Sequence, residues 1–176
     1  MLKNKNIKLI LAALFLSIGV VLPLLTSQIK EIGDTLLPMH IPVLLCGLIC
    51  GGKYGFFVGL ILPFLRSLMF GMPQIYPNAV WMAVELATYG LVVGLMYFKL
   101  NRKSIVSVYI SLITAMLLGR VVWGIAKTVL LGINSKPFTF ALFITGGFVD
   151  AIPGIVLQLI LIPLIIQIVN NRRIIK

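Results

Sequence analysis

Long apolar runs, separated by short stretches that contain charged residues, glycine or proline, dominate the sequence. A helix needs about 20 residues to cross a bilayer, and a backbone surrounded by lipid must form its hydrogen bonds within the helix. The pattern therefore predicts an all-α membrane protein whose six transmembrane helices form a single domain over residues 1–176. The six runs are Ile7 to Leu25, His40 to Gly51, Lys53 to Phe70, Pro77 to Phe98, Ile105 to Leu131 and Phe138 to Val169.

Two of these runs differ in length from a simple span. The second is short, and a tight turn around Gly51 and Lys53 separates it from the third. The last is long enough to tilt or to contain a turn. Pro63, Pro153 and Pro163 fall inside the runs, where a proline removes a backbone hydrogen bond. We expect kinks at these three prolines rather than helix ends.

The composition supports a membrane location and excludes several classes of protein. Of the 176 residues, 60% are hydrophobic and 11% are charged, whereas a soluble domain carries about 25% charged residues. The mean hydropathy is +1.13. These values exclude a soluble enzyme, a secreted disulfide-linked domain and a nucleic-acid-binding domain.

The residues that usually support catalysis or metal binding are sparse. Cys46 and Cys50 lie four residues apart with no nearby histidine or carboxylate, so we expect them to pack in the core rather than to hold a metal. The sequence has no Walker-type phosphate-binding loop and no set of serine, histidine and acid at one depth. We therefore expect no enzymatic activity, no metal and no cofactor.

The distribution of the basic residues orients the predicted helices. The net charge is +11, from 15 basic and 4 acidic residues. Lysine and arginine accumulate on the cytoplasmic side of membrane proteins. Only Lys30 and Lys136 lie in the connections on one side of the six-helix topology, so both termini are predicted to be cytoplasmic. The basic residues on the cytoplasmic side are Lys3, Lys5, Lys8, Lys53, Lys99, Arg102, Lys103, Arg172, Arg173 and Lys176.

Five charged residues remain inside the predicted helices, all in the outer half of the membrane. Ionisable groups there are costly and usually pair with one another or line a polar cavity. We expect a substrate pocket open to the outside, and its excess of one positive charge favours a small anionic ligand. With His40 and four aromatic residues at a similar depth, the predicted ligand-binding set is His40, Arg66, Tyr76, Trp81, Glu85, Tyr89, Arg120, Trp123, Lys127 and Asp150.

The same residues also allow purely structural interpretations. Arg120 with Asp150, or Arg66 with Glu85, could form ion pairs that only join helices, and Lys127 could extend to the outer lipid headgroups. Two alternative functions follow from the charges. One is a small ion-coupled carrier in which Glu85 or Asp150 takes a proton, and the other is a membrane scaffold or assembly subunit.

Small residues recur at four-residue spacing along three of the predicted helices. This spacing places them on one helix face, where they let neighbouring helices approach closely. The positions are Gly47, Gly51, Gly55 and Gly59 across the second and third helices, Gly90 and Gly94 on the fourth, and Ala13 and Ser17 on the first.

The sequence resembles the substrate-binding (S) components of energy-coupling factor (ECF) transporters, the vitamin importers of prokaryotes. The stretch Ile41 to Gly47, followed by Gly51 to Gly59, is similar to the family's Gly-Pro-x-x-Gly-x-x-x-Gly segment, with Gly52-Lys53 near the position where Gly-Pro is usual. The topology extends the resemblance over essentially the whole chain. It implies a six-helix protein of the prokaryotic cell membrane that binds one vitamin-like molecule near its external face.

The resemblance also implies partners. S components dock through a small-xxx-small motif on their first helix onto a transmembrane coupling protein, which works with two ATPase subunits. Ala13 and Ser17 are the candidate docking residues here, with serine where alanine is typical. The identity of the substrate does not carry over between subfamilies. The positive charge of the predicted pocket favours a carboxylate vitamin such as pantothenate or nicotinate.

Overall fold

A computed structural model describes residues 4–26, 37–100, 104–133 and 139–171, and all regular structure in these ranges is helical. The helices join into six spans, of which the fourth begins with the π-helical turn η1 and the last contains a second π-helical turn, η2. In order, the elements are α1 (Lys5–Thr26), α3 (His40–Cys50), α4 (Gly52–Phe70), η1 (Ile75–Ala79), α5 (Val80–Lys99), α6 (Ile105–Ile133), α7 (Phe140–Ile144), η2 (Thr145–Val149) and α8 (Ile152–Asn171).

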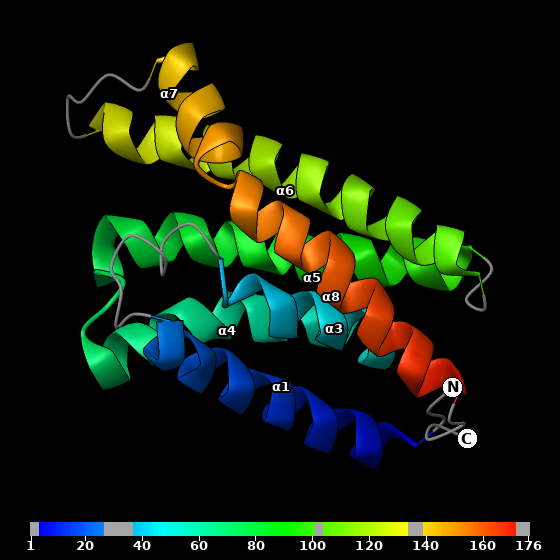
Figure 1. The fold of residues 1–176 in the computed structure, drawn as a ribbon. Coiled ribbons are helices and arrows are strands. Elements are labelled where there is room, and N and C mark those ends of the chain that lie inside the picture. Colours follow the sequence, from blue (N-terminus) through cyan, green and yellow to red (C-terminus); the bar gives the residue numbers. More distant parts are fainter. Residues whose placement is uncertain (1–3, 27–36, 101–103, 134–138, 172–176) are drawn as a thin grey trace.

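This arrangement confirms the prediction of an all-α membrane protein with six spans. In the described part of the chain, five helical stretches are long and apolar enough to cross a membrane, and α3 is a shorter apolar helix. Successive spans run in opposite directions, so the start of α1 and the end of α8 lie at the same end of the bundle (Figure 1). We call this the inner end, because the sequence predicts that it faces the cytoplasm, and the opposite end the outer end.

The last span is interrupted rather than kinked. Asp150 and Ala151 form a turn between η2 and α8, and Pro153 is the second residue of α8. A proline in the first turn of a helix costs little, because its missing N–H would have no partner there. The kink predicted at Pro153 is therefore wrong, since this proline belongs to a helix start. Pro63 and Pro163 lie inside α4 and α8.

Helix α5 is central in the bundle. It contacts α3, α4 and α6, while α1 packs against α3 and α4, and α8 contacts α3 and α6 (Figure 1). Apolar side chains from these helices form the core. The outward faces of α1, α6 and α8 expose large apolar side chains such as Leu9, Ile113 and Ile160, as expected of helices that face lipid.

Glycines bring α3, α4 and α5 into close contact. A Cβ atom added to Gly90 would collide with the backbone of Gly55, and one added to Gly94 would collide with the backbone of Gly52. A Cβ atom at Gly47 would meet the carbonyl oxygen of Gly90. Because a backbone cannot move aside as a flexible side chain can, only glycine fits at these positions. The close helix approach predicted from the glycine spacing is confirmed.

Gly90→Ala tests this contact between helices. We expect the added methyl group to push α4 and α5 apart and to lower the stability of the protein by about 1–3 kcal/mol, the usual cost of overpacking. The measurement is the melting temperature of the detergent-purified protein. Gly132→Ala is the matched control, because nothing lies within 4 Å of a Cβ atom at that position. Equal melting temperatures for the two variants would contradict this description of the contact.

Candidate functional site

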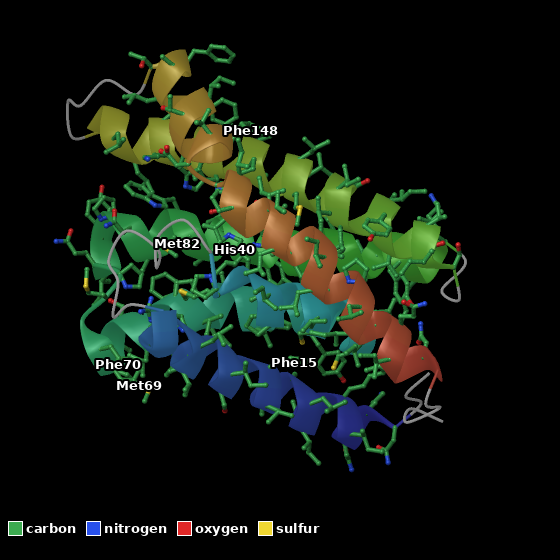
Figure 2. The ribbon with its side chains drawn as sticks, in the orientation of Figure 1. Phe15, His40, Met69, Phe70, Met82 and Phe148 are labelled. Carbon is green, nitrogen blue, oxygen red and sulfur yellow. The ribbon has the colours of Figure 1, made fainter. Side chains whose placement is uncertain are left out.

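A buried carboxylate, Glu85 on α5, forms the centre of a polar region inside the bundle. Its Oε1 atom lies 3.0 Å from Nη1 of Arg120 on α6 and 3.6 Å from Nε2 of His40 on α3. All three side chains are buried, and Glu85 is only 2% exposed. His40, the first residue of α3, lies in the interior of the bundle (Figure 2). The contacts of Glu85 therefore join three helices.

Arg120 balances the charge of Glu85 with only part of its guanidinium group. The contact between Nη1 and Oε1 is an ion pair without the alignment of a hydrogen bond. The Nε and Nη2 atoms of Arg120 are buried and have no hydrogen-bond partner among the described residues. The Nε–H and Nη2–H groups form one edge of the guanidinium and fit the two oxygens of a carboxylate. Arg120 thus keeps a two-donor edge available beside Glu85.

Tyr89 covers this ionic group from one turn further along α5. The centroids of the Tyr89 and His40 rings are 5.1 Å apart, with an interplanar angle of 57°. A Cβ atom at Gly119 would collide with the tyrosine ring. Gly119 therefore lets Tyr89 pack directly against α6 next to Arg120.

Two tryptophans and a lysine extend the polar region along α6 toward the outer end. Nζ of Lys127 lies 4.5 Å from the ring centroid of Trp123 and 5.4 Å from that of Trp81. The guanidinium carbon of Arg120 lies 5.9 Å from the Trp123 ring centroid. Cations at these distances are attracted to the face of the indole. We call the following residues the polar cluster: His40, Trp81, Glu85, Tyr89, Arg120, Trp123 and Lys127.

The structure places the other three predicted ligand-binding residues outside the polar cluster. Arg66 is half-buried on α4, and its Nη1 donates to Sδ of Met39 at 3.6 Å. Tyr76, in η1, is 52% exposed. Asp150 is exposed in the turn before α8. The buried partner of Arg120 is therefore Glu85, and neither of the two ion pairs considered from the sequence is the one that forms.

A hollow between α6 and α7 differs in character from the polar cluster. It encloses about 500 Å³ and is lined by apolar and hydroxyl-bearing residues, with no charged side chain. Phe140 and Phe143 contribute its α7 side, and the ring of Phe143 lies 6.2 Å from that of Trp123. No group of three or more histidine, cysteine or acidic residues that could hold a metal occurs among the described residues. The charged side chains that contact one another in the described interior thus lie in the polar cluster, not in this hollow.

A family model described as ECF transporter, substrate-specific component, matches residues 7–166, which is nearly the whole chain. The chain belongs to the S components of ECF transporters. A search of curated proteins found no match. As an S component, the protein is a membrane-embedded substrate-binding subunit of a transporter, not an enzyme. It associates with an ECF module, which consists of a coupling protein and ATPases.

The two candidate docking residues of this S component lie on the outward face of α1. Ala13 and Ser17 are both exposed. The Ser17 hydroxyl donates to the carbonyl oxygen of Ala13 at 3.0 Å, so its hydrogen bond is satisfied within the helix. The opposite face of α1 packs inward through Ala12 and Gly19. The outward face thus combines two small residues with the apolar side chains around them.

Sequence reasoning missed one buried polar residue of this S component, Gln158 on α8. Its side chain is 1% exposed, and its Nε2 atom has no hydrogen-bond partner in the described part of the chain. A search for charged groups passed over this neutral amide. The sequence does contain a usable signal. Gly154, Gln158 and Ile162 are spaced four residues apart, which places the amide on the otherwise apolar inward face of α8.

Proposed function

We propose that this S component captures a small carboxylate in the outer half of the prokaryotic cell membrane, for import driven by the ECF module. The observation that carries the proposal is the Nε–Nη2 edge of Arg120, which is buried and has no partner among the described residues. A guanidinium edge binds a carboxylate through two parallel hydrogen bonds. Because Glu85 lies against Nη1, Glu85 and the ligand would occupy different sides of the same guanidinium.

The charges of the polar cluster support an anionic ligand. Arg120 and Lys127 carry two positive charges, whereas Glu85 carries one negative charge. A carboxylate ligand would bring the summed charge of Glu85, Arg120 and Lys127 closer to zero, and charge balance matters more in the low dielectric of a buried site than in water. A cationic ligand would instead add a third positive charge to these groups. The ligand class that this arrangement favours is therefore a monocarboxylate.

The buried nitrogen atoms that find no hydrogen-bond partner among the described residues also favour a ligand rich in acceptors. They include Nδ1 of His40, Nε and Nη2 of Arg120, and Nε2 of Gln158. The arginine and glutamine nitrogens can only donate hydrogen bonds, and an imidazole nitrogen can do either. A carboxylate with additional carbonyl, hydroxyl or ring-nitrogen groups matches these donors.

The aromatic side of the site accepts the less polar part of such a ligand. Trp81 and Trp123 supply flat apolar surfaces beside Lys127, and small-molecule sites commonly combine such surfaces with a few polar groups. Pantothenate and nicotinate are the two carboxylate vitamins that we propose as candidate substrates. Both carry acceptor atoms beyond the carboxylate, and nicotinate also carries an aromatic ring.

We further propose that the outward face of α1 docks onto the coupling protein through Ala13 and Ser17. Small side chains on an exposed face permit close approach of another transmembrane helix, and both residues are exposed there. The hydroxyl of Ser17 is already bonded within α1, so it can enter an apolar interface without losing a hydrogen bond. The presence of serine in place of alanine is therefore compatible with docking.

Arg120→Lys tests the carboxylate site. Lysine keeps a positive charge near Glu85 but lacks the two-donor edge of arginine. We expect the affinity for the carboxylate to fall at least about tenfold, which corresponds to about 1.4 kcal/mol, in a protein that still folds. Fluorescence titration with pantothenate and with nicotinate measures this loss, because the only two tryptophans of the chain, Trp81 and Trp123, belong to the polar cluster.

Lys99→Ala is the control for this titration, because Lys99 lies at the inner end of α5. We expect the Lys99→Ala variant to bind the carboxylate with the affinity of the wild type. Native mass spectrometry of the purified wild type adds an independent readout of bound small molecules. Wild-type protein that responds to neither vitamin and carries no bound carboxylate would refute the proposed ligand class. An Arg120→Lys variant with wild-type affinity would refute the assigned role of Arg120.

Ala13→Phe tests the docking surface. The phenyl group would hold a partner helix away from α1, so we expect less coupling protein to copurify while the carboxylate titration stays unchanged. Ile160→Phe is the control, because Ile160 is an exposed residue of α8 on a different face of the bundle. If both variants recover the same amount of coupling protein as the wild type, Ala13 is not part of the docking surface.

A further inference from the structure

Gln158 occupies a position where an apolar side chain would pack without penalty. The inward face of α8 is formed by small and aliphatic residues on either side of it, among them Gly154, Ile162 and Ile166. The Gln158 side chain is 1% exposed, so lipid and bulk water do not reach it. The primary amide of Gln158 therefore lies among apolar residues of α8.

α8 packs against two helices that carry residues of the polar cluster. It contacts α3, which begins with His40, and α6, which carries Arg120. α8 begins at about the level of the outer end of α3 and runs toward the inner end in the same direction (Figure 1). Gln158 lies six residues beyond Ile152, which is about 9 Å along the helix axis. The amide therefore lies on a helix that shares its neighbours with the polar cluster, about two turns from the start of that helix.

A buried amide donor needs an acceptor. Leaving such a donor without a partner costs free energy, and for this reason buried polar groups in proteins are nearly always hydrogen-bonded. The Nε2 atom of Gln158 has no acceptor among the described residues. The carbonyl groups of α8 mostly accept from the helix itself, and the exception beside Gln158 is that of Leu159, because Pro163 has no N–H to donate to it. A ligand that enters the core beside α8 would supply the acceptor that Gln158 lacks among the described residues.

We propose that the amide of Gln158 is a specificity-determining contact at the floor of the site, where it donates a hydrogen bond to a second acceptor of the carboxylate ligand. This inference rests on the proposed function. Arg120 would bind the carboxylate of the ligand, and Gln158 would bind a second polar group of the same ligand. The ligand class is then a carboxylate with a carbonyl, hydroxyl or ring nitrogen away from the carboxyl group. A simple fatty acid would satisfy Arg120 and leave Gln158 without an acceptor.

Gln158→Met tests this contact, because methionine has nearly the same length and shape but cannot donate a hydrogen bond. Tryptophan fluorescence titrations with pantothenate and nicotinate should show about tenfold weaker binding of the vitamin that the wild type binds. The melting temperature of the ligand-free variant should equal or exceed that of the wild type, because a donor without a partner is removed from the core. Gln167→Met is the matched control, since Gln167 is an exposed glutamine of the same helix.

The two readouts separate the possible outcomes. Weaker binding with an undiminished ligand-free melting temperature supports the contact, provided that Gln167→Met matches the wild type. Unchanged binding by Gln158→Met overturns it. A lowered ligand-free melting temperature, or failure of Gln158→Met alone to fold, shows that the amide has a structural partner within the protein and also overturns it. If wild-type protein binds neither vitamin and carries no bound carboxylate in native mass spectrometry, the proposed function itself fails and this inference fails with it.

Discussion

The ion pair between Glu85 and Arg120 is the constraint on which the rest of this S component depends. Either charge buried without the other in an apolar helix bundle would cost several kcal/mol. α5 and α6 must therefore hold these two residues at the same depth, with an Oε1–Nη1 distance of 3.0 Å. His40 brings the start of α3 to the same carboxylate. The glycine contacts among α3, α4 and α5 make this convergence possible, because they let the helices approach closely enough for short side chains to meet.

The ion pair uses only one side of the Arg120 guanidinium, so the other side can serve the proposed ligand. Glu85 contacts one nitrogen of the guanidinium, so it compensates the buried charge of Arg120 while the Nε–Nη2 edge remains without a partner among the described residues. The tryptophan rings lie beside Arg120 and Lys127, and the Tyr89 ring lies beside His40. The protein therefore offsets the cost of burying charge through Glu85, and the edge of Arg120 that faces away from this contact is the one that we propose for the ligand. The outer surface of the helices, in contrast, is apolar and suits lipid and a docking partner.

The sequence allowed most of the fold to be predicted, because the bilayer imposes a length and a hydropathy on every span. The membership of the polar cluster was harder to predict. Estimating depth from residue number assumes continuous helices, and the turn at Asp150 breaks that assumption, which moves Asp150 out of the buried region. The choice of Glu85 as the partner of Arg120 depends on helix rotation and on contacts that span 35 residues of sequence, which hydropathy does not encode.

Two further details depend on packing. Tyr76 is exposed. Its backbone is non-helical within η1, so the orientation of its side chain does not follow from a helical pattern. Gln158 was missed because a neutral amide carries no charge signal, and only its burial makes it conspicuous. The presence of a helix can therefore be predicted from local sequence. The partners of a buried polar group depend on tertiary contacts, which local sequence does not specify.

The most direct test of the central claim is a high-resolution structure of this S component purified with bound pantothenate or nicotinate. We predict that both carboxylate oxygens of the vitamin lie about 2.7–2.9 Å from Nε and Nη2 of Arg120, the usual distances for charged hydrogen bonds, while Nη1 stays beside Glu85. A vitamin bound elsewhere, for instance in the apolar hollow between α6 and α7, with Arg120 in contact only with Glu85, would contradict it.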